Sequence, residues 1–137
     1  MDTQDLTEML IHALENSQAG FTSFKETFAQ CSAAFELGKD QEGIQLLSSL
    51  LPPIKDFTAF CADIARTHGE NIPEALFQEF DKQCSTFKDL IADMLEEMED
   101  CNYVEVGDIL KYDLGDLIDS MAVTFQKIAD TLKGLDS

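Results

Sequence analysis

Apolar residues recur along most of this chain at alternating spacings of three and four positions. The clearest stripe lies in the third quarter of the sequence, and its members are Phe77, Phe80, Cys84, Phe87, Ile91, Met94, Met98 and Cys101. Residues at these spacings share one face of an α-helix, so the pattern predicts an amphipathic helix of about seven turns. Such a face must be covered. In a chain with no predicted strand, the cover is other helices.

Three further stretches show the same periodicity. The first ends at Gly38, the second follows a short polar turn and ends at Gly69, and the last begins after Asn102. Long helices that are joined by short turns pack as neighbours of alternating direction. The sequence therefore predicts an all-α protein, an antiparallel up-down-up-down four-helix bundle in which residues 1–137 form a single domain.

Two places inside the predicted helices are unfavourable for helix formation. Gly20 lies in the first helix, where glycine costs about 1 kcal/mol relative to alanine, so a break near Gly20 is the alternative to one long helix. Pro52 and Pro53 lie in the second helix, and each proline removes a hydrogen bond and clashes with a preceding carbonyl. The apolar stripe keeps its phase across both prolines, since Leu50 and Ile54 share one face. We therefore expect one helix kinked at Pro52-Pro53, with two shorter helices as the alternative.

Charge limits the classes of partner. The 137 residues include 9 Lys and Arg against 27 Asp and Glu, which gives a formal net charge of −18. This charge repels nucleic-acid backbones and anionic membrane surfaces. No stretch approaches the roughly 18 consecutive apolar residues of a membrane-spanning helix, and the first residues lack the pattern of a secretory signal. We expect a soluble, cytoplasmic protein that binds neither nucleic acid nor membrane.

The histidines and cysteines do not follow the spacing of known metal sites. Helical bundles that bind two metal ions use a Glu-x-x-His motif, whereas Met9 stands three positions before His12 and Ala65 three before His68. The cysteines lack the close pairs of zinc sites and fall on or beside apolar stripes, where a reduced thiol packs as a small hydrophobe. They are Cys31, Cys61, Cys84 and Cys101. With no nucleophile motif or phosphate loop either, we expect no metal, no cofactor and no catalytic residue.

His12 supports an alternative function. The segment His12–Ser17 resembles the histidine motif of phosphotransfer (HPt) domains, which are also four-helix bundles of similar size. That family has a lysine and a glycine where this chain has Glu15 and Asn16. The lysine favours the phosphoryl group, whereas Glu15 would repel it. The resemblance implies an HPt-like signalling domain in which His12 accepts the phosphoryl group.

The densest charge lies in the segment Asp93–Asp119, where Lys111 is the only basic residue. A negative surface at the turn between the third and fourth helices would attract a basic segment of a protein partner, and two tyrosines beside the acids are candidate anchors. The alternative is a solvated face that only keeps the protein soluble. The candidate partner-binding residues are Glu96, Glu97, Glu99, Asp100, Tyr103, Glu105, Asp108, Tyr112, Asp113 and Asp116.

Two parts of the chain resemble recurrent segments of an uncharacterised family of small, acidic helical-bundle proteins of bacteria, some of them encoded near motility genes. These parts are Phe35–Lys39 with Gly43–Leu47, and Val106–Leu114. The later part resembles that family's Asp-x-Leu-Glu-Tyr-Glu-Leu pattern, with Lys111 where an acid is usual and Gly115-Asp116 where a proline-containing turn is common. The resemblance covers about residues 35–118, and it implies no activity.

Together these patterns favour a non-enzymatic protein-binding module, an adaptor or a chaperone-like protein. Such a module would hold its protein partner through the acidic turn or through an exposed groove of the bundle. A homodimer also fits the pattern, because apolar residues outside the inner stripes, such as Phe60 and Leu90, are suited to an interface between two copies. The HPt-like signalling domain is the alternative.

Overall fold

The computed structural model describes residues 3–135, and nearly all of them are helical. The elements are α1 (Thr3–Glu36), α2 (Asp40–His68), the 3-10 turn η1 (Gly69–Asn71), α3 (Glu74–Glu99), α4 (Tyr103–Asp108), the π-helical segment η2 (Ile109–Leu114) and α5 (Gly115–Leu135). Because α4, η2 and α5 follow one another without a gap, they form one fourth rod. The predicted all-α four-helix bundle is confirmed for this part of the chain.

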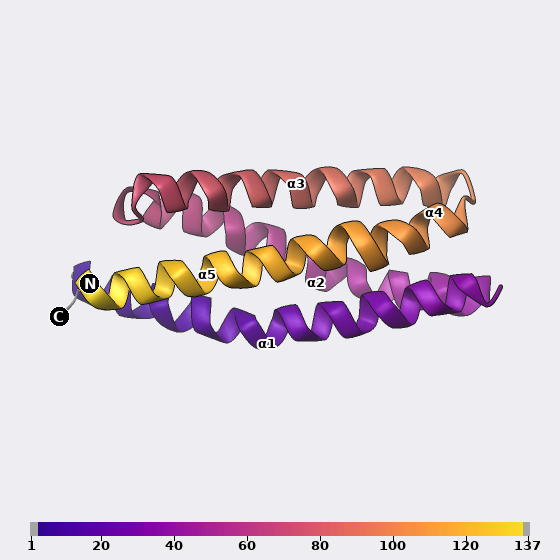
Figure 1. Cartoon of the computed structure of the whole chain (residues 1–137), viewed down its shortest axis with the longest axis horizontal. Helices are drawn as coiled ribbons and strands as arrows, with labels where there is room; N and C mark the ends of the chain where they lie inside the picture. Colours follow the sequence, from indigo (N-terminus) through magenta and orange to yellow (C-terminus); the bar gives the residue numbers. More distant parts are fainter. Residues whose placement is uncertain (1–2, 136–137) are drawn as a thin grey trace.

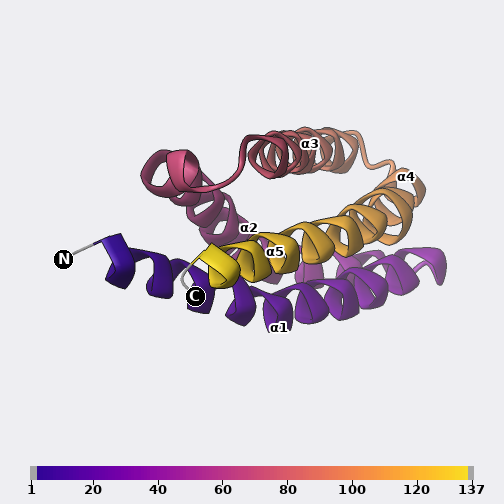
Figure 2. The ribbon, with the colours of Figure 1, turned by 60° about the vertical axis from the view of Figure 1, so that its left-hand side comes forward.

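The four rods are not packed equally tightly. Figure 1 and Figure 2 show α1 and α3 on opposite sides of the molecule, with α2 and α5 between them. In both views α2 crosses the bundle obliquely, from the end of α1 toward the start of α3. As a result, α2 contacts α3 much less than it contacts α1. The seam between α2 and α3 is therefore the loosest between helices that follow one another in the chain.

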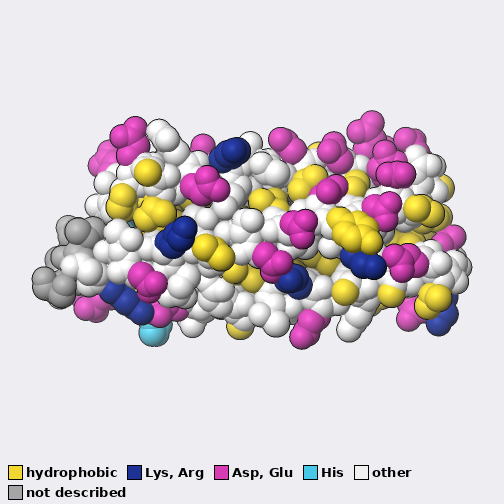
Figure 3. All heavy atoms as spheres, viewed as in Figure 1, with side chains coloured by type: hydrophobic (Ala, Val, Ile, Leu, Met, Phe, Trp, Pro, Cys, Tyr) yellow, Lys and Arg dark blue, Asp and Glu magenta, His cyan; other side chains and the backbone are white. Residues whose placement is uncertain are grey.

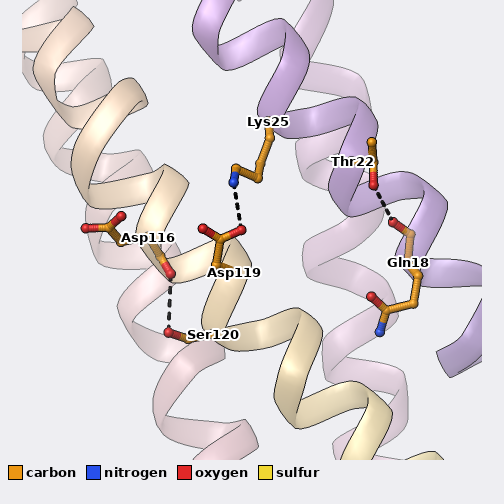
Figure 4. A network of polar contacts seen from close by, with 6 residues as sticks. All are labelled: Gln18, Thr22, Lys25, Asp116, Asp119 and Ser120. Atoms are coloured by element: carbon orange, nitrogen blue, oxygen red, sulfur yellow. Dashed lines mark hydrogen bonds and ion pairs between the residues drawn. The ribbon is translucent and has the colours of Figure 1, made fainter.

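Polar contacts join α1 to the fourth rod. They link Glu15 to Lys133 at 2.8 Å, Gln18 to the carbonyl of Ala122 at 2.9 Å, Lys25 to Asp119 at 2.7 Å and Ser32 to the carbonyl of Gly107 at 3.0 Å. Figure 4 shows the Lys25–Asp119 ion pair, while the Asp116 side chain points away from it. Residue numbers increase along α1 while those of their contact partners decrease along the fourth rod. The ion pairs are exposed and set register more than they add stability.

The centre of the core is aromatic. The ring of Phe57 on α2 meets Phe21 and Phe24 on α1, Phe87 on α3 and Phe125 on α5, with ring centroids 5.5, 5.9, 5.2 and 6.2 Å apart. Phe125 is fully buried. Aromatic pairs contribute about 0.5 to 1.5 kcal/mol beyond the area that they bury. This cluster therefore ties all four rods together at one level of the bundle.

Both unfavourable sites in the predicted helices are accommodated. Helix α1 is continuous through Gly20, and α2 is continuous through Pro52 and Pro53. The two alternative predictions, a break near Gly20 and two shorter helices in place of α2, are therefore wrong. Leu14 and Phe21 are buried on either side of the glycine, and their packing outweighs its cost of about 1 kcal/mol. The prolines lie on the exposed side of α2, where water solvates the carbonyls that lose their helical donors.

The predicted fourth helix is present, but at Ile109–Leu114 it departs from α-helical geometry and forms the π-helical segment η2. Val106, Leu110, Leu114 and Ile118 are all fully buried, and each lies four positions after the one before. In an α-helix, a spacing of four overshoots a full turn by about 40°, so such a row drifts off the buried face. A π-turn holds more residues and offsets the drift. This strict spacing of four was the available signal for η2.

Candidate functional site

The predicted acidic residues lie around the turn where α3 leads into α4 and along the fourth rod as far as the start of α5 (Figure 1). We call them the acidic surface, which comprises Glu96, Glu97, Glu99, Asp100, Glu105, Asp108, Asp113 and Asp116. All are exposed except Glu97, which is half-buried and accepts a hydrogen bond from Nδ2 of Asn102 at 2.7 Å. Figure 3 shows acidic side chains gathered near this turn. Attraction of a basic segment to this surface stays a prediction.

The two tyrosines near the acidic surface differ in their surroundings. Tyr103 is half-buried, and its ring stacks on Phe35 of α1 with centroids 5.3 Å apart and planes 3° from parallel. A hydrogen bond with Cys101 raises the pKa of the Tyr103 hydroxyl. Tyr112 is 55% exposed, and Nζ of Lys111 lies 5.4 Å from its ring centroid. Tyr103 is thus occupied by packing within the bundle, which leaves Tyr112 as the candidate anchor.

His12 is exposed on α1 beside a shallow hollow of about 590 Å³. Asp5 and Glu8 also line this hollow, together with Asn16. Carboxylates so close to the imidazole would repel an incoming phosphoryl group. The local charge therefore opposes phosphotransfer through His12, and that alternative function stays a prediction.

The four cysteines have different environments. Cys31 and Cys61 are buried, Cys84 is half-buried and Cys101 is exposed. A hydrogen bond with Cys84, together with burial, raises the pKa of the Cys61 thiol far above its usual value. Burial raises the pKa of Cys31 to about 11. The prediction that the cysteines pack in the core is thus confirmed for Cys31 and Cys61 and is wrong for Cys101. Cys101 lies in the turn after α3, with a left-handed φ of 60°.

Two structural requirements, one for metal binding and one for crossing a membrane, are not met within the described part of the chain, residues 3–135. No three His, Cys, Asp or Glu side chains in this range are grouped so that they would hold a metal ion. None of its helices combines the length and the apolarity that crossing a bilayer requires.

An apolar hollow between α2 and α3, of about 660 Å³, has no counterpart among the predicted site residues. We call it the α2–α3 groove; its lining consists of Leu51, Ile54, Lys55, Thr58, Ala59, Ala62, Lys88, Ile91, Ala92 and Leu95. A second hollow of about 560 Å³ shares Ala62 and Lys88 with the groove and continues it toward the α2–α3 connection. Arg66 and Asp81 also line this second hollow. The open seam therefore extends along much of both helices.

Short side chains and the oblique course of α2 explain why this seam stays open. Ala59 and Ala62 on α2 and Ala92 on α3 are exposed and too short to bridge the two helices. Leu51 and Leu95 remain 37% and 39% exposed, although both have apolar neighbours in the groove. The sequence pattern predicted an exposed groove but not its position. The available signal was this second apolar face, beside the inner stripes of α2 and α3.

The charge of the groove is opposite to that of the whole chain. Lys55 and Lys88 are the only charged residues among those that line it, in a protein whose net charge is −18. Lys25, Lys111 and Lys133 each form an ion pair with a carboxylate. Neither groove lysine forms one with any carboxylate of residues 3–135. The two ammonium groups are therefore available to an anionic partner.

Comparison with known proteins places the chain in a family. A family model described as a domain of unknown function (DUF8042) matches residues 12–124, which include the α2–α3 groove and the whole acidic surface. No curated protein and no solved structure matches the chain. Because the family model spans most of its length, the chain belongs to the DUF8042 family of domains of unknown function.

Proposed function

We propose that this protein is a non-enzymatic protein-binding module, an adaptor or a chaperone-like protein, that holds a helix of its partner in the α2–α3 groove. The observation that carries this proposal is an open apolar seam on the outside of a bundle whose centre is closed by aromatic packing. The proposed scaffold is an antiparallel up-down-up-down bundle. The proposed setting is the cytoplasm, where reduced cysteines such as those in this core are usual.

The groove has the dimensions that a helix needs. Its lining on α2 begins at Leu51, and the hollow that continues it reaches Arg66. At a rise of 1.5 Å per residue, this stretch is about 20 Å long, which matches about four turns of a partner helix. The alanines on both walls let a third backbone approach to the usual interaxial distance of about 8 to 10 Å. An amphipathic helix would enter with apolar side chains at alternating spacings of three and four.

The apolar lining supplies the driving force for docking. Each square ångström of apolar surface that is removed from water contributes about 25 cal/mol. Leu51, Ile91 and Leu95 all keep surface exposed that a partner helix would cover. Contiguous apolar surface of this kind on a soluble protein usually marks an interaction site.

One substitution that fills the groove tests the proposal. Ala59→Trp places an indole ring in the groove, while Ala29→Trp places the same ring on an exposed position of α1 that lines none of the hollows described above. The tagged full-length protein and both variants are used to recover partners from a native lysate. We expect a stoichiometric protein partner with the wild type and with Ala29→Trp, and its loss with Ala59→Trp.

Circular dichroism and urea unfolding of both variants show whether the fold is kept. A partner that Ala59→Trp retains as well as the wild type would contradict docking in the groove. A labile phosphoryl label on His12, after incubation with a phosphorylated receiver domain, would instead assign the signalling function.

A further inference from the structure

We infer that the partner helix held in the α2–α3 groove carries carboxylates on both sides of its apolar stripe. This inference rests on the proposed function and names the chemistry of the partner. It runs against the overall charge of the chain, since a net charge of −18 would by itself favour a basic partner.

The two groove lysines lie on opposite walls. Lys55 belongs to α2 and Lys88 to α3, and both line the same hollow of about 660 Å³. A helix that lies between α2 and α3 turns its apolar stripe toward the floor and its flanking positions toward the two walls. These flanks correspond to the charged positions beside a coiled-coil seam, which decide the choice of partner. Each wall therefore places one ammonium group beside one flank of the bound helix.

Nearby acids do not cancel this local charge. Asp56 and Asp89, which follow the two groove lysines in sequence, are exposed and do not line the groove. The acidic surface lies on α4, η2 and the flanking ends of α3 and α5, outside the groove lining. Water and salt screen the interactions of exposed charges, with a Debye length of about 8 Å at physiological ionic strength. A charge contact that the docked helix shields from water is screened much less. The two lysines therefore decide which charge the flanking residues of the partner helix carry.

The preference for acid is confined to one part of the seam. In the hollow that continues the groove, Arg66 and Asp81 carry opposite charges, and Arg66 is already paired with Asp63 at 2.7 Å. Apart from Lys88, which this hollow shares with the groove, its lining has no net charge to select for. The carboxylates of the partner are therefore expected beside the part of the groove that Lys55 and Lys88 flank.

The groove fits a single helix better than a second copy of the whole chain. The groove and the hollow that continues it are lined by 17 residues together, whereas a stable interface between two globular proteins involves about 20 to 30 residues on each side. A single helical segment can bury its apolar stripe on a surface of this size, and the rest of the partner protein need not contact the bundle. We therefore assign the groove to a helical segment of another protein.

A displayed library of helices tests the inference with the full-length protein as bait. Each helix has about 18 residues, with Leu and Ala along its stripe and Glu, Lys or Gln randomised at the flanking positions. Recovered helices are synthesised with a fluorescent label, and their dissociation constants are measured by anisotropy. The comparison uses Lys55→Glu/Lys88→Glu, the matched control Lys82→Glu/Lys127→Glu, and Ala59→Trp. Lys82 and Lys127 are exposed outside the groove, and both double variants change the net charge equally.

We expect the recovered helices to carry Glu at the flanks and to bind Lys55→Glu/Lys88→Glu about tenfold or more weakly than the matched control. Recovered helices that carry Lys or Gln at their flanks would overturn the inferred acidic chemistry. If these helices still fail to bind Ala59→Trp, the proposed docking in the groove is supported. Recovery of no helix, or of helices that bind Ala59→Trp as well as the wild type, would overturn both. A dimer in light scattering that Ala59→Trp converts to a monomer would assign the groove to a second copy and overturn the inference.

Discussion

Gly43, in the first turn of α2, packs directly against the ring of Phe35 near the end of α1. A Cβ atom built on Gly43 would lie 2.5 Å from Cε1 of Phe35. Tyr103 stacks on the same ring, and Sγ of Cys31 donates a hydrogen bond to the carbonyl of Gly43 at 3.2 Å. These contacts hold the start of α2 close to α1. Since α2 must also reach the start of α3, it crosses the bundle obliquely, and the α2–α3 groove opens.

We predict that Gly43→Ala lowers the free energy of unfolding by about 1 to 3 kcal/mol, because the added methyl group forces a shift of Phe35, which Tyr103 holds in place. Urea unfolding followed by circular dichroism measures the change. Gly20→Ala is the matched control, since a Cβ there would meet nothing within 4 Å. It should stabilise the protein by about 0.5 to 1 kcal/mol. Equal shifts in the two variants would contradict the close packing at Gly43.

Among the aromatic residues of the core, we expect substitution of Phe125 to lower the free energy of unfolding strongly. This side chain is fully buried and meets Phe21, Phe57 and Phe80. We expect Phe125→Ala to cost about 3 to 5 kcal/mol of unfolding free energy, the usual loss for a buried phenylalanine. The half-buried Phe60 serves as control, and Phe60→Ala should cost clearly less. A similar shift of the urea midpoint in both variants would argue against Phe125 as the centre of the core.

Thiol reactivity should follow burial and pKa. The thiolate is the reactive form, and the thiols of Cys31 and Cys61 are buried with raised pKa values. In the native protein near pH 8 we expect iodoacetamide to label Cys101 first, and to label Cys31 and Cys61 only when urea unfolds the chain. Mass spectrometry of proteolytic peptides reports the order of labelling. Native labelling of Cys61 at the rate of Cys101 would contradict the packing between α2 and α3.

His68, in the last turn of α2, should make stability depend on pH. Burial lowers the pKa of this histidine below its ordinary value of 6.5. The unfolded chain therefore takes up the proton more readily than the folded one, so the contribution of His68 is fully present above pH 6.5 and falls as the pH drops below it.

Between about pH 7.5 and about pH 5.5, the wild type should lose unfolding free energy relative to His68→Gln. Comparing the two proteins at each pH cancels the titration of the carboxylates that they share. A difference that stays constant, or one of opposite sign, would show that His68 is not desolvated in the fold.

Helical periodicity in the amino-acid sequence was enough to predict the helices and their buried faces. Phe80, Phe87 and Met94 were expected on one stripe of α3, and all three are buried. This inference succeeds because helical periodicity is a local property, and a stripe of apolar residues identifies its buried face whichever helix covers it. The positions of the acidic surface along the chain followed from the same local reasoning.

The packing of the helices against one another could not be predicted in the same way. Continuity through Gly20, stacking of Tyr103 on Phe35 and exposure of Cys101 all depend on neighbours that are distant in sequence. The α2–α3 groove depends on them most, because its width comes from the contact of Gly43 with Phe35 at one end of α2 and from alanines that do not bridge the gap farther along. Spacing along one helix carries no information about the distance to the next. For that reason the pattern predicted a bundle, and packing alone decided which seam stayed open.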